Sequence, residues 1–413
     1  MRIIILVTLF ASACQPEPAV DTGPVPVVDG AHACTFVLRE PPMLGEDPED
    51  LPYATPHAPS LGDAPEPYNL RLGVHIEPSS DATLMWQTDM ATVASRVKLE
   101  GPEGVVYIDG ASFPVPDDSS RAHEVRMCGL EPSTTYGYRV GGRGAWSEDE
   151  HSFTTASADP EAPVRLVVLG DSRDDLKVWV DVLGLAAAHE PDFFLHTGDV
   201  VALGGLQSLW DEWLAASEFV LAEIPVFTVH GNHEFMAPNY FGAFALPGNE
   251  QWYGLDWGPL HLTVLNDMAP GDSGDEQTAW LPTDLAGTDR PWRIMSHHQP
   301  SWTDGSHSAN MEARDDWNPL LEAYAPHTLV LAGHNHLYER CVPIIGDEQD
   351  PEGVTYVTTG GSGAPLYGVG SDWFLHLTES TYHYMVIDIT VDSMQVVAYR
   401  MDGSVLDSFE LTR

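Results

Sequence analysis

The stretch VRLVVLGD, residues 164–171, joins a short apolar and β-branched run to an aspartate. Four similar runs follow along the chain, at Phe193–Leu195, Val226–Val229, Arg293–Met295 and Thr328–Leu331. Each run is followed by residues of a type that binds metal ions: Asp171, Asp199, Asn232, His298, and the pair His334 and His336. Asp and Asn are common where a strand gives way to a loop, so one such residue alone means little. Together they predict a two-metal site.

The runs also indicate a layered α/β domain. Short β-branched or aromatic runs are typical of buried strands. Helix-like stretches at Leu176–His189 and Leu206–Ala222 separate several of them, and strands that alternate with helices favour a largely parallel sheet. In such sheets the loops beyond the carboxyl ends of the strands converge on one crevice. We therefore expect the candidate ligands to meet in space.

The order of the motifs resembles that of the calcineurin-like metallophosphoesterases. The motifs are Gly170-Asp171, Gly198-Asp199, Gly231-Asn232-His233-Glu234, His298-Gln299-Pro300 and Gly333-His334-Asn335-His336. The GNHE string, and the extension of the last motif through Leu337-Tyr338-Glu339-Arg340, are similar to the purple-acid-phosphatase branch. The resemblance covers residues 163–413. It implies a four-layer α/β/β/α sandwich and an enzyme that hydrolyses phosphoric esters.

The residue types suit a pair of cations. A carboxylate between two cations lowers their repulsion and sets their spacing, and Asp199 is the candidate bridge. The resemblance assigns the remaining ligands to two half-sites, which are Asp171 and His336 for the first, and Asn232, His298 and His334 for the second. Mixed oxygen and nitrogen ligands suit Fe, Zn or Mn without choosing among them.

Three further side chains are candidates for catalysis. The expected nucleophile is a water activated by the metal ions, so the protein must neutralise phosphoryl charge and protonate the leaving alcohol. His233 fits either task by its place next to a ligand, and His307 matches a position that handles the leaving group in related acid phosphatases. Arg173 suits a phosphate contact because of its guanidinium fork. The alternatives are a solvated loop for His307 and pairing with Asp174 or Asp175 for Arg173.

The first half-site departs from the family. Many members carry a histidine two residues after the first Asp, where this chain has Arg173. Purple acid phosphatases use a tyrosine three residues after the bridging Asp, where this chain has Ala202. The recognisable ligands of this half-site are therefore Asp171, Asp199 and His336. We expect an active but colourless enzyme, since the purple colour depends on a tyrosinate bound to ferric iron.

Two further motifs have alternative interpretations. His297 is the alternative to His298 as a ligand, and the residues that follow, Gln299-Pro300, favour His298. Gly360-Gly361-Ser362-Gly363 resembles a phosphate-binding turn, but it follows the strand-like run Val354–Thr358 and lacks the lysine of a nucleotide loop. We expect this turn to shape the wall of the site.

Residues 66–157 indicate a different architecture. Short alternating runs between polar or Gly/Pro breaks predict an antiparallel all-β sandwich. The runs are Leu70–Ile76, Ala82–Thr88, Arg96–Leu99, Val105–Ile108, His123–Met127, Tyr136–Val140 and Ser152–Thr154. Trp86 is expected in the core. The segment Leu130–Tyr138 resembles the tyrosine corner of a fibronectin type III-like domain, and such a module precedes the catalytic domain of plant purple acid phosphatases.

The N-terminal residues predict export. Residues 1–13 combine a basic start, an apolar run too short to span a bilayer, and small residues before Cys14, as in a signal peptide. Cys14 resembles the lipidated cysteine of a bacterial lipoprotein, and ordinary secretion is the alternative. Residues 14–65 are rich in Pro and acidic residues and are expected to form a disordered tether. The predicted location is the bacterial cell envelope or the extracellular medium.

Cysteine usage agrees with an oxidising compartment without defining a framework. Besides Cys14 the chain has Cys34, Cys128 and Cys341, which permit one disulfide and leave one thiol. The spacing does not choose the pair.

The charge limits the partners. The chain has 62 acidic and 18 basic residues, a formal net charge of -44. Such a surface repels nucleic acids and anionic membranes. We expect a phosphorylated small molecule or ester as substrate, no nucleic acid, and membrane contact only through the lipid anchor. The leading prediction is hydrolysis of phosphate monoesters. The alternatives are phosphodiester hydrolysis and a noncatalytic, degenerate phosphate-binding lipoprotein.

Overall fold

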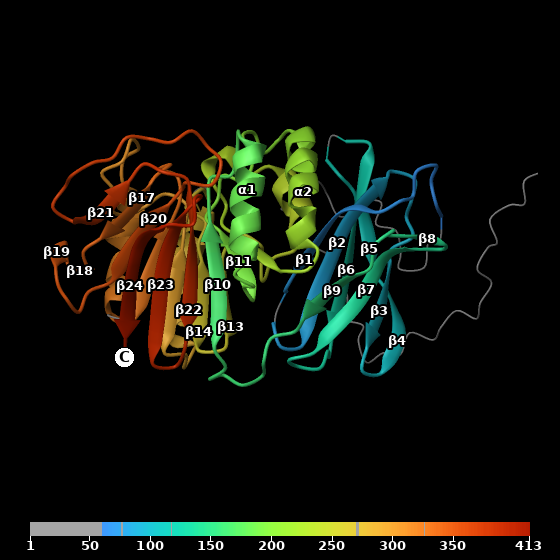
Figure 1. Ribbon diagram of the computed structural model, residues 1–413, viewed down its shortest axis with the longest axis horizontal. Helices are drawn as coiled ribbons and strands as arrows, with labels where there is room; N and C mark the ends of the chain where they lie inside the picture. Colours follow the sequence, from blue (N-terminus) through green and yellow to red (C-terminus); the bar gives the residue numbers. More distant parts are fainter. Residues whose placement is uncertain (1–59, 76, 117, 270–271, 326) are drawn as a thin grey trace, which may run out of the picture.

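The computed structural model describes residues 60–75, 77–116, 118–269, 272–325 and 327–413. The predicted signal peptide, Cys14, and the tether up to residue 59 lie outside the described residues. Within the described ranges an all-β sandwich precedes an α/β domain, and the two lie side by side (Figure 1). No helix in these ranges combines the length and apolar character needed to cross a membrane.

The sandwich consists of two antiparallel sheets. One contains β1 (Tyr68–Gly73), β2 (Asp81–Asp89), β6 (Ser120–Cys128) and β5 (Ala111–Pro114). The other contains β4 (Gly104–Asp109), β3 (Arg96–Gly101), β7 (Thr135–Gly142), β8 (Ala145–Trp146) and β9 (His151–Thr154). The short strands β5 and β8 were missed by the sequence analysis. Trp86 is fully buried in the core between the sheets, as predicted.

The tyrosine corner has the expected geometry. The hydroxyl of Tyr136 accepts a hydrogen bond from the backbone N–H of Glu131 at 2.8 Å. This bond links the start of β7 to the chain just before it, which is the role of such a corner in sandwich domains.

The first sheet of the α/β domain is mixed. Its order is β12 (Val226–Thr228), β11 (Phe193–His196), β10 (Val164–Leu169), β22 (His383–Ile389), β23 (Ser393–Arg400) and β24 (Val405–Thr412). Strands β10, β11 and β12 are parallel, whereas β22 to β24 run antiparallel. Helices α1 (Leu176–Ala187) and α2 (Gln207–Leu221) cover its outer face (Figure 1). Trp179, Val182, Leu183 and Ala186 recur at helical spacing on the buried face of α1.

The second sheet has the order β13 (Tyr253–Trp257), β14 (Leu260–Val264), β15 (Trp292–Ser296), β16 (Thr328–Ala332), β20 (Thr355–Thr359), β17 (Tyr338–Cys341) and β21 (Leu375–Glu379). Strands β14, β15, β16 and β20 are parallel.

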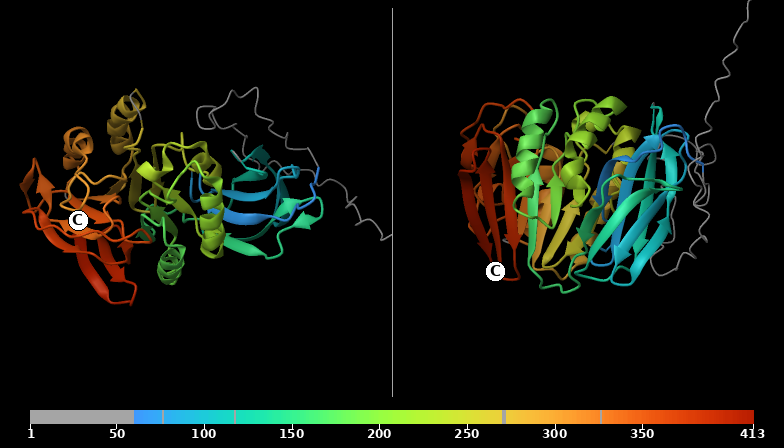
Figure 2. Two further views of the ribbon diagram at one scale, coloured as in Figure 1. Left: turned by 90° about the horizontal axis from the view of Figure 1, so that it is seen from above. Right: turned by 45° about the vertical axis from the view of Figure 1, so that its right-hand side comes forward.

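The elements outside the two large sheets are α3 (Pro238–Ala243), α4 (Asp272–Ala286), a π-helical turn (Ala313–Trp317), α5 (Asn318–Glu322), and the hairpin of β18 (Ile344–Ile345) and β19 (Glu348–Gln349). Figure 2 shows these layers from two further sides.

Burial explains why the sheets form the middle layers. On β15, Ile294 belongs to the core cluster shared with the first sheet and α1, whereas its neighbour Met295 packs with Leu281 and Leu285 of α4. Neighbouring strand residues point to opposite faces, so both faces of this sheet are covered. The predicted four-layer α/β/β/α sandwich is confirmed. The predicted largely parallel sheet needs correction, because both sheets are mixed: β22 to β24 pair antiparallel in the first sheet, and β13, β17 and β21 pair antiparallel in the second. Strands such as β22 to β24 follow one another through short connections, which antiparallel strands allow and parallel strands do not.

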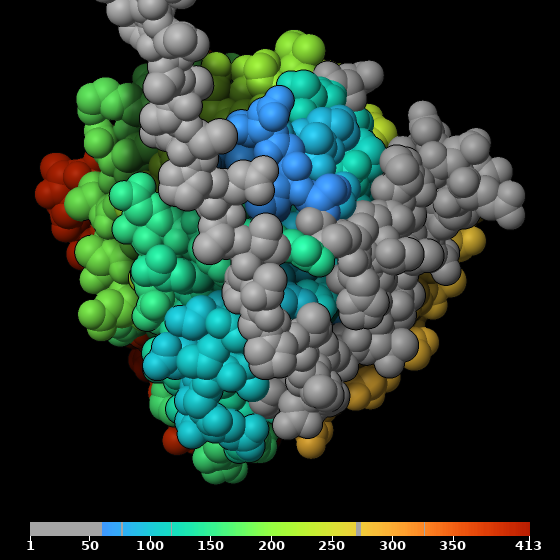
Figure 3. All heavy atoms as spheres, turned by 90° about the vertical axis from the view of Figure 1, so that its right-hand side faces the viewer, coloured from blue at the N-terminus to red at the C-terminus, as the bar shows by residue number. Residues whose placement is uncertain are grey.

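The sandwich is attached to α2 and α3 of the α/β domain. Arg71 of β1 donates hydrogen bonds to the backbone carbonyls of Gly242 and Ala243, and the Tyr138 hydroxyl donates to the carbonyl of Ala222. Gln87 donates to the Asp211 side chain at 3.1 Å. Figure 3 shows the molecule from the sandwich end, with α/β-domain residues visible around its rim. The sandwich is thus a packing partner of the enzyme-like domain.

Two cysteines lie in the described part of the chain. Cys128, at the end of β6, is disulfide-bonded, and its partner lies outside the described residues. Cys341 is free and buried, and burial raises the pKa of its thiol. This resolves which of the two is bonded, a point that the spacing had left open.

Candidate metal centre

The candidate ligands lie on loops at the carboxyl ends of the parallel strands. Asp171, Asp199 and His334 follow β10, β11 and β16 within three residues and have positive φ angles of 56°, 56° and 66°. Residues other than glycine rarely adopt a positive φ angle, because this backbone conformation costs free energy. Such residues are concentrated at functional sites. The glycines before the ligands permit the tight packing, since a Cβ on Gly333 would lie 2.5 Å from Asp171 Oδ2.

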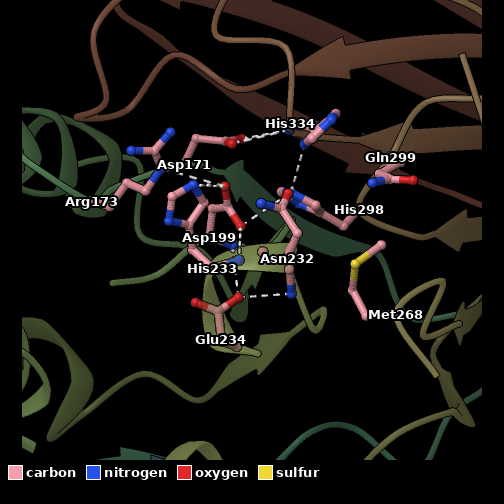
Figure 4. Close-up of polar contacts among 12 residues, drawn as sticks. Asp171, Arg173, Asp199, Asn232, His233, Glu234, Met268, His298, Gln299 and His334 are labelled. Carbon is pink, nitrogen blue, oxygen red and sulfur yellow. Dashed lines mark hydrogen bonds and ion pairs between the residues drawn. The ribbon is translucent and has the colours of Figure 1, made fainter. Parts of the chain in front are cut away.

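One group of ligand atoms surrounds His298. Its Nε2 lies 3.2 Å from Asp199 Oδ1, 3.1 Å from Asn232 Oδ1 and 3.3 Å from His334 Nδ1. The ligand atoms of Asp199, His298 and His334 all lie within 4.8 Å of one another. Figure 4 shows these side chains, with Asn232, pointing toward one another.

A second group shares Asp199. It contains Asp171, Asp199 and His336, again with all ligand atoms within 4.8 Å. Asp171 Oδ1 lies 3.5 Å from His336 Nε2, and all three side chains are buried. Because Asp199 belongs to both groups, its carboxylate is placed where a bridge between two cations is needed.

The histidines are oriented by backbone carbonyls. His298 Nδ1 lies 2.8 Å from the carbonyl oxygen of Thr197, and His336 Nδ1 lies 2.7 Å from that of Pro365. A carbonyl accepts only from a protonated Nδ1, so in the neutral form of each ring, the form that binds a metal ion, the lone pair is on Nε2 and faces the carboxylates. Metal-ligating histidines are held in this way.

The charges of the cluster are strongly coupled. Burial lowers the pKa of His298, but the charges of Asp199 and Asp171 outweigh burial and raise this pKa to about 10. Burial opposes ionisation of Asp199, yet His298 and His233 hold its pKa well below the usual range. Buried or partly buried carboxylate, imidazole and amide donors that face one another are the mixed set that Fe, Zn or Mn takes. The residues present therefore fit a pair of such ions.

The structure separates the two neighbouring candidates at the end of β15. His298 enters the cluster, whereas the ring of His297 lies 5.6 Å from that of Trp317, and its Nδ1 is 3.8 Å from Asp267 Oδ2. Adjacent residues point to opposite faces of the second sheet. His297 therefore lies away from the candidate ligands.

Glu234 holds the two ligand loops together through hydrogen bonds to their backbones. Its buried carboxylate accepts hydrogen bonds from the backbone N–H groups of Asp199, Val200 and Gly231, at 3.0, 2.8 and 2.7 Å. Burial and the nearby charge of Asp199 raise the pKa of Glu234 to about 8. The GNHE motif thus joins the loops after β11 and β12 through one side chain (Figure 4).

The three predicted catalytic side chains surround the ligands. His233 Nδ1 lies 2.7 Å from the carbonyl oxygen of Ala202, which directs its Nε2 toward Asp199 Oδ2 at 3.8 Å. The exposed His307 ring lies 4.4 Å from the ring of His334. Arg173 is largely buried and reaches Asp199, with Nε 3.4 Å from Oδ2. The structure brings all three to the site, and their roles remain predictions.

Arg173 also has one of the structural partners that the sequence allowed. It forms an ion pair with Asp174 at 2.5 Å. Asp175, the other possible partner, instead accepts from the backbone N–H groups of Lys177 and Val178 and caps α1.

Two residues at the site were missed by the sequence analysis. Asp267 accepts hydrogen bonds from the backbone N–H groups of His298 and Gln299, at 3.3 and 2.6 Å. It follows β14, so the strand-end signal would have found it. The Tyr367 ring is stacked on that of His336 at 4.0 Å, and its hydroxyl lies 3.3 Å from His307 Nε2. Tyr367 belongs to a loop without a recognisable motif, so no local signal identifies it.

The glycine-rich turn after β20 lies against the first ligand loop. Ser362 N–H donates to the carbonyl of Gly170 and Ala364 N–H to that of Asp171, at 3.1 and 2.8 Å. A Cβ on Gly360 would lie 2.8 Å from Asp171 Oδ2. The turn therefore forms a wall of the site, as predicted.

Comparison with known proteins finds a family match for each domain. Residues 164–338 match the calcineurin-like phosphoesterase family, and residues 67–155 match the N-terminal domain of purple acid phosphatase. Purple acid phosphatase 21 of Arabidopsis thaliana is 31% identical over 267 residues, which is 60% of this chain and 59% of that protein. Purple acid phosphatase 15 of the same plant is 30% identical over 285 residues, covering 58% and 53%. The chain thus spans little more than half the length of these relatives.

Solved structures agree with the fold. A purple acid phosphatase from yellow lupin seeds superimposes with a TM-score of 0.73 at 19% identity, over 84% of this chain and 74% of that one. The structure of PhoD gives a TM-score of 0.64 at 14% identity, over 85% and 94%. The two-domain architecture is therefore shared across these proteins.

Proposed function

Because the chain joins a calcineurin-like phosphoesterase domain to a purple acid phosphatase N-terminal domain, we propose that it hydrolyses phosphate monoesters with two metal ions. The observation that carries this proposal is the place of the Asp199 carboxylate in both ligand groups. The ions would be held by Asp171, Asp199, Asn232, His298, His334 and His336. When bound, such ions polarise phosphoryl oxygens and increase the acidity of water.

We infer that His233 binds the phosphoryl group. Its Nδ1 donates to the Ala202 carbonyl, so Nε2 is directed to the side of the site where Asp199 Oδ2 lies. When both ring nitrogens carry a proton, Nε2 is a donor already fixed at this point, and it needs no reorganisation when charge develops on a phosphoryl oxygen. We assign His233 to this contact.

His307 and Tyr367 are placed at the exposed side of the site, where an alcohol would leave. During hydrolysis a water oxygen adds to phosphorus and gives up one proton, the bond from phosphorus to the alcohol oxygen breaks, and that alcohol oxygen takes up one proton. The His307 Nε2 and the Tyr367 hydroxyl lie 3.3 Å apart, and the His307 ring lies beside that of His334. We assign His307 to the leaving-group oxygen, with Tyr367 orienting its ring.

We also propose that the protein acts after export, as a lipoprotein or a secreted protein. The signal-like residues 1–13 support this, and so does the disulfide at Cys128, since disulfides persist in oxidising compartments. The net charge of -44 favours small substrates over nucleic acids. We propose that the sandwich domain spans residues 66–157 and the catalytic domain residues 163–413.

The test combines metal analysis with two chromogenic substrates. Purified protein is expected to contain two metal ions and to hydrolyse p-nitrophenyl phosphate faster than bis(p-nitrophenyl) phosphate. A chelator should abolish turnover, and added metal should restore it. Faster diester hydrolysis would indicate the phosphodiesterase alternative. Two bound ions without turnover of either substrate would indicate a noncatalytic phosphate-binding protein.

The colour of iron-loaded protein tests the departure at position 202. The methyl side chain of Ala202 cannot supply a phenolate to a metal ion, and its backbone carbonyl accepts a hydrogen bond from His233. Iron-loaded protein is therefore expected to lack the visible charge-transfer band of a tyrosinate bound to ferric iron. The absorption spectrum measures this directly, and a purple protein would contradict the prediction.

A further inference from the structure

We propose that Arg173 makes the two half-sites unequal in their affinity for metal. In this proposal the half-site of Asp171, Asp199 and His336 binds its cation more weakly, fills last and empties first. The inference rests on the proposed function only in that two cations bind. Its tests measure metal binding, so they do not depend on turnover.

Arg173 contacts two of the three donors of this half-site. Its Nε lies 3.4 Å from Asp199 Oδ2, and its Nη2 lies 3.3 Å from His336 Nε2. The Asp199 oxygens are thus divided, because Oδ1 faces His298 and Oδ2 faces the guanidinium. A cation in the first half-site must compete with Arg173 for Oδ2 and for the His336 lone pair.

The guanidinium is held in place by further contacts. Its Nη1 is paired with Asp174 at 2.5 Å, and the side chain is only 13% exposed. Arg173 also lies close enough to Tyr367, whose ring is stacked on His336, to lower the pKa of its hydroxyl against the larger effect of burial. The positive charge therefore stays beside the half-site, and moving it away breaks the ion pair with Asp174.

The other half-site lacks this conflict and has more donors. It combines Asp199 Oδ1 with Asn232, His298 and His334, which makes four donors against three. A guanidinium stays protonated at every accessible pH, so its repulsion of a nearby cation cannot be relieved by losing a proton. The first half-site has a second carboxylate, that of Asp171, but the charge of Arg173 offsets it, so the larger number of donors favours the other half-site.

The consequence is a protein whose metal content follows the supply of free metal. A full charge a few ångströms from a cation changes affinity by about tenfold or more at a partly buried site. At low free metal the protein would hold one ion, and at higher free metal two. The activity would then depend on the second step.

The experiment is a titration of metal-free, full-length protein with Zn²⁺. Calorimetry gives the steps, and equilibrium dialysis with elemental analysis gives the ions bound per chain. Wild-type protein is expected to show two steps separated by about tenfold or more in Kd. Arg173→Gln, which removes the charge and keeps a polar side chain, should strengthen the weaker step by about tenfold and leave the tighter step nearly unchanged.

Two further variants sharpen the assignment. Arg173→His offers a nitrogen donor in place of the charge and should bring the two steps together. Lys177→Ala removes an equal charge four residues away, where the side chain is 83% exposed and paired with Asp181, and should change neither step. His336→Ala should abolish the weaker step alone. Circular dichroism of each metal-free variant verifies folding.

Specific results would overturn the proposal. Two equal steps in the wild-type protein, or an Arg173→Gln titration that matches wild type, would show that Arg173 does not set the order. By contrast, two ordered steps without hydrolysis would leave this inference standing and remove the proposed function.

Discussion

Two buried histidines show how differently the two domains use burial. His123 in the sandwich and His298 at the metal centre are both fully buried. His123 is stacked on Trp86 at 5.0 Å, its Nε2 lies 2.7 Å from Thr88 Oγ1, and burial lowers its pKa to about 3. The pKa of His298 is raised to about 10 because the charges of Asp199 and Asp171 outweigh burial.

The difference between the two histidines shows which features distinguish the metal centre from a packed core. A buried histidine in a packed core behaves as an apolar ring with one hydrogen bond. At the strand ends, in contrast, buried charged groups face one another on loops with positive φ angles. Burial alone does not indicate function; convergence of such donors on one point does.

The largest expected effect comes from removing the shared carboxylate. Asp199→Asn should lower kcat/KM by at least about a thousandfold and release metal, because metal ions supply several kcal/mol of transition-state stabilisation. Folding should survive, as measured by circular dichroism. Asp388→Asn, which breaks the half-exposed ion pair with Arg165, is the matched control and should keep its metal. Unchanged activity in the Asp199 variant would remove the bridge assignment.

The opposite pattern is expected in the sandwich. Trp86→Ala should lower the free energy of unfolding by about 4 kcal/mol, because it leaves a large cavity in the core. Folded protein should keep its metal and its turnover per active site. Trp146→Ala, at a partly buried position on β8, should cost clearly less. Denaturant unfolding gives both free energies. Loss of metal by the folded Trp86→Ala variant would contradict the prediction that the sandwich core affects stability and not metal binding.

His261 tests whether carboxylate partners alone make a site. It lies at the start of β14, at the opposite end of the sheet from the metal centre, 2.7 Å from Asp256 and 3.0 Å from Asp284. Burial lowers its pKa, but hydrogen bonds to both carboxylates outweigh burial and raise the pKa to about 9.

The resulting pH dependence has a defined sign. The folded pKa of His261 is above the unfolded one, so its stabilisation is complete below the unfolded pKa and is lost as pH rises through about 9. The contribution is about 3 kcal/mol. His261→Gln should flatten unfolding free energy against pH between 7 and 10 and leave metal content unchanged. A loss of metal would assign His261 to the site.

The smallest effect is expected for His123→Phe, and the same substitution at His298 is its matched comparison. His123→Phe should change stability at pH 7 by about 1 kcal/mol or less, because the stack on Trp86 is kept and one hydrogen bond is lost. His298→Phe should instead release metal. Thermal unfolding and elemental analysis measure the two outcomes. A large loss of metal from the His123 variant would contradict the comparison.

Much of the architecture could be predicted because its signals are local. The β-branched runs, the helical spacing on α1 and the corner at Tyr136 each depend on a few neighbouring residues. The short strands β5 and β8 and the antiparallel half of the first sheet could not be predicted in this way. Their pairing depends on partners elsewhere in the chain, which a local pattern does not contain.

The sequence by itself determined which side chains could bind metal, because strand ends and the glycines beside them are written in consecutive residues. Only the tertiary structure decided how those side chains are supported and opposed. It placed Arg173 between Asp199 and His336, and it stacked Tyr367 on His336. The physical reason is that charge and stacking act through space, between groups whose distance in the chain carries no trace of their contact.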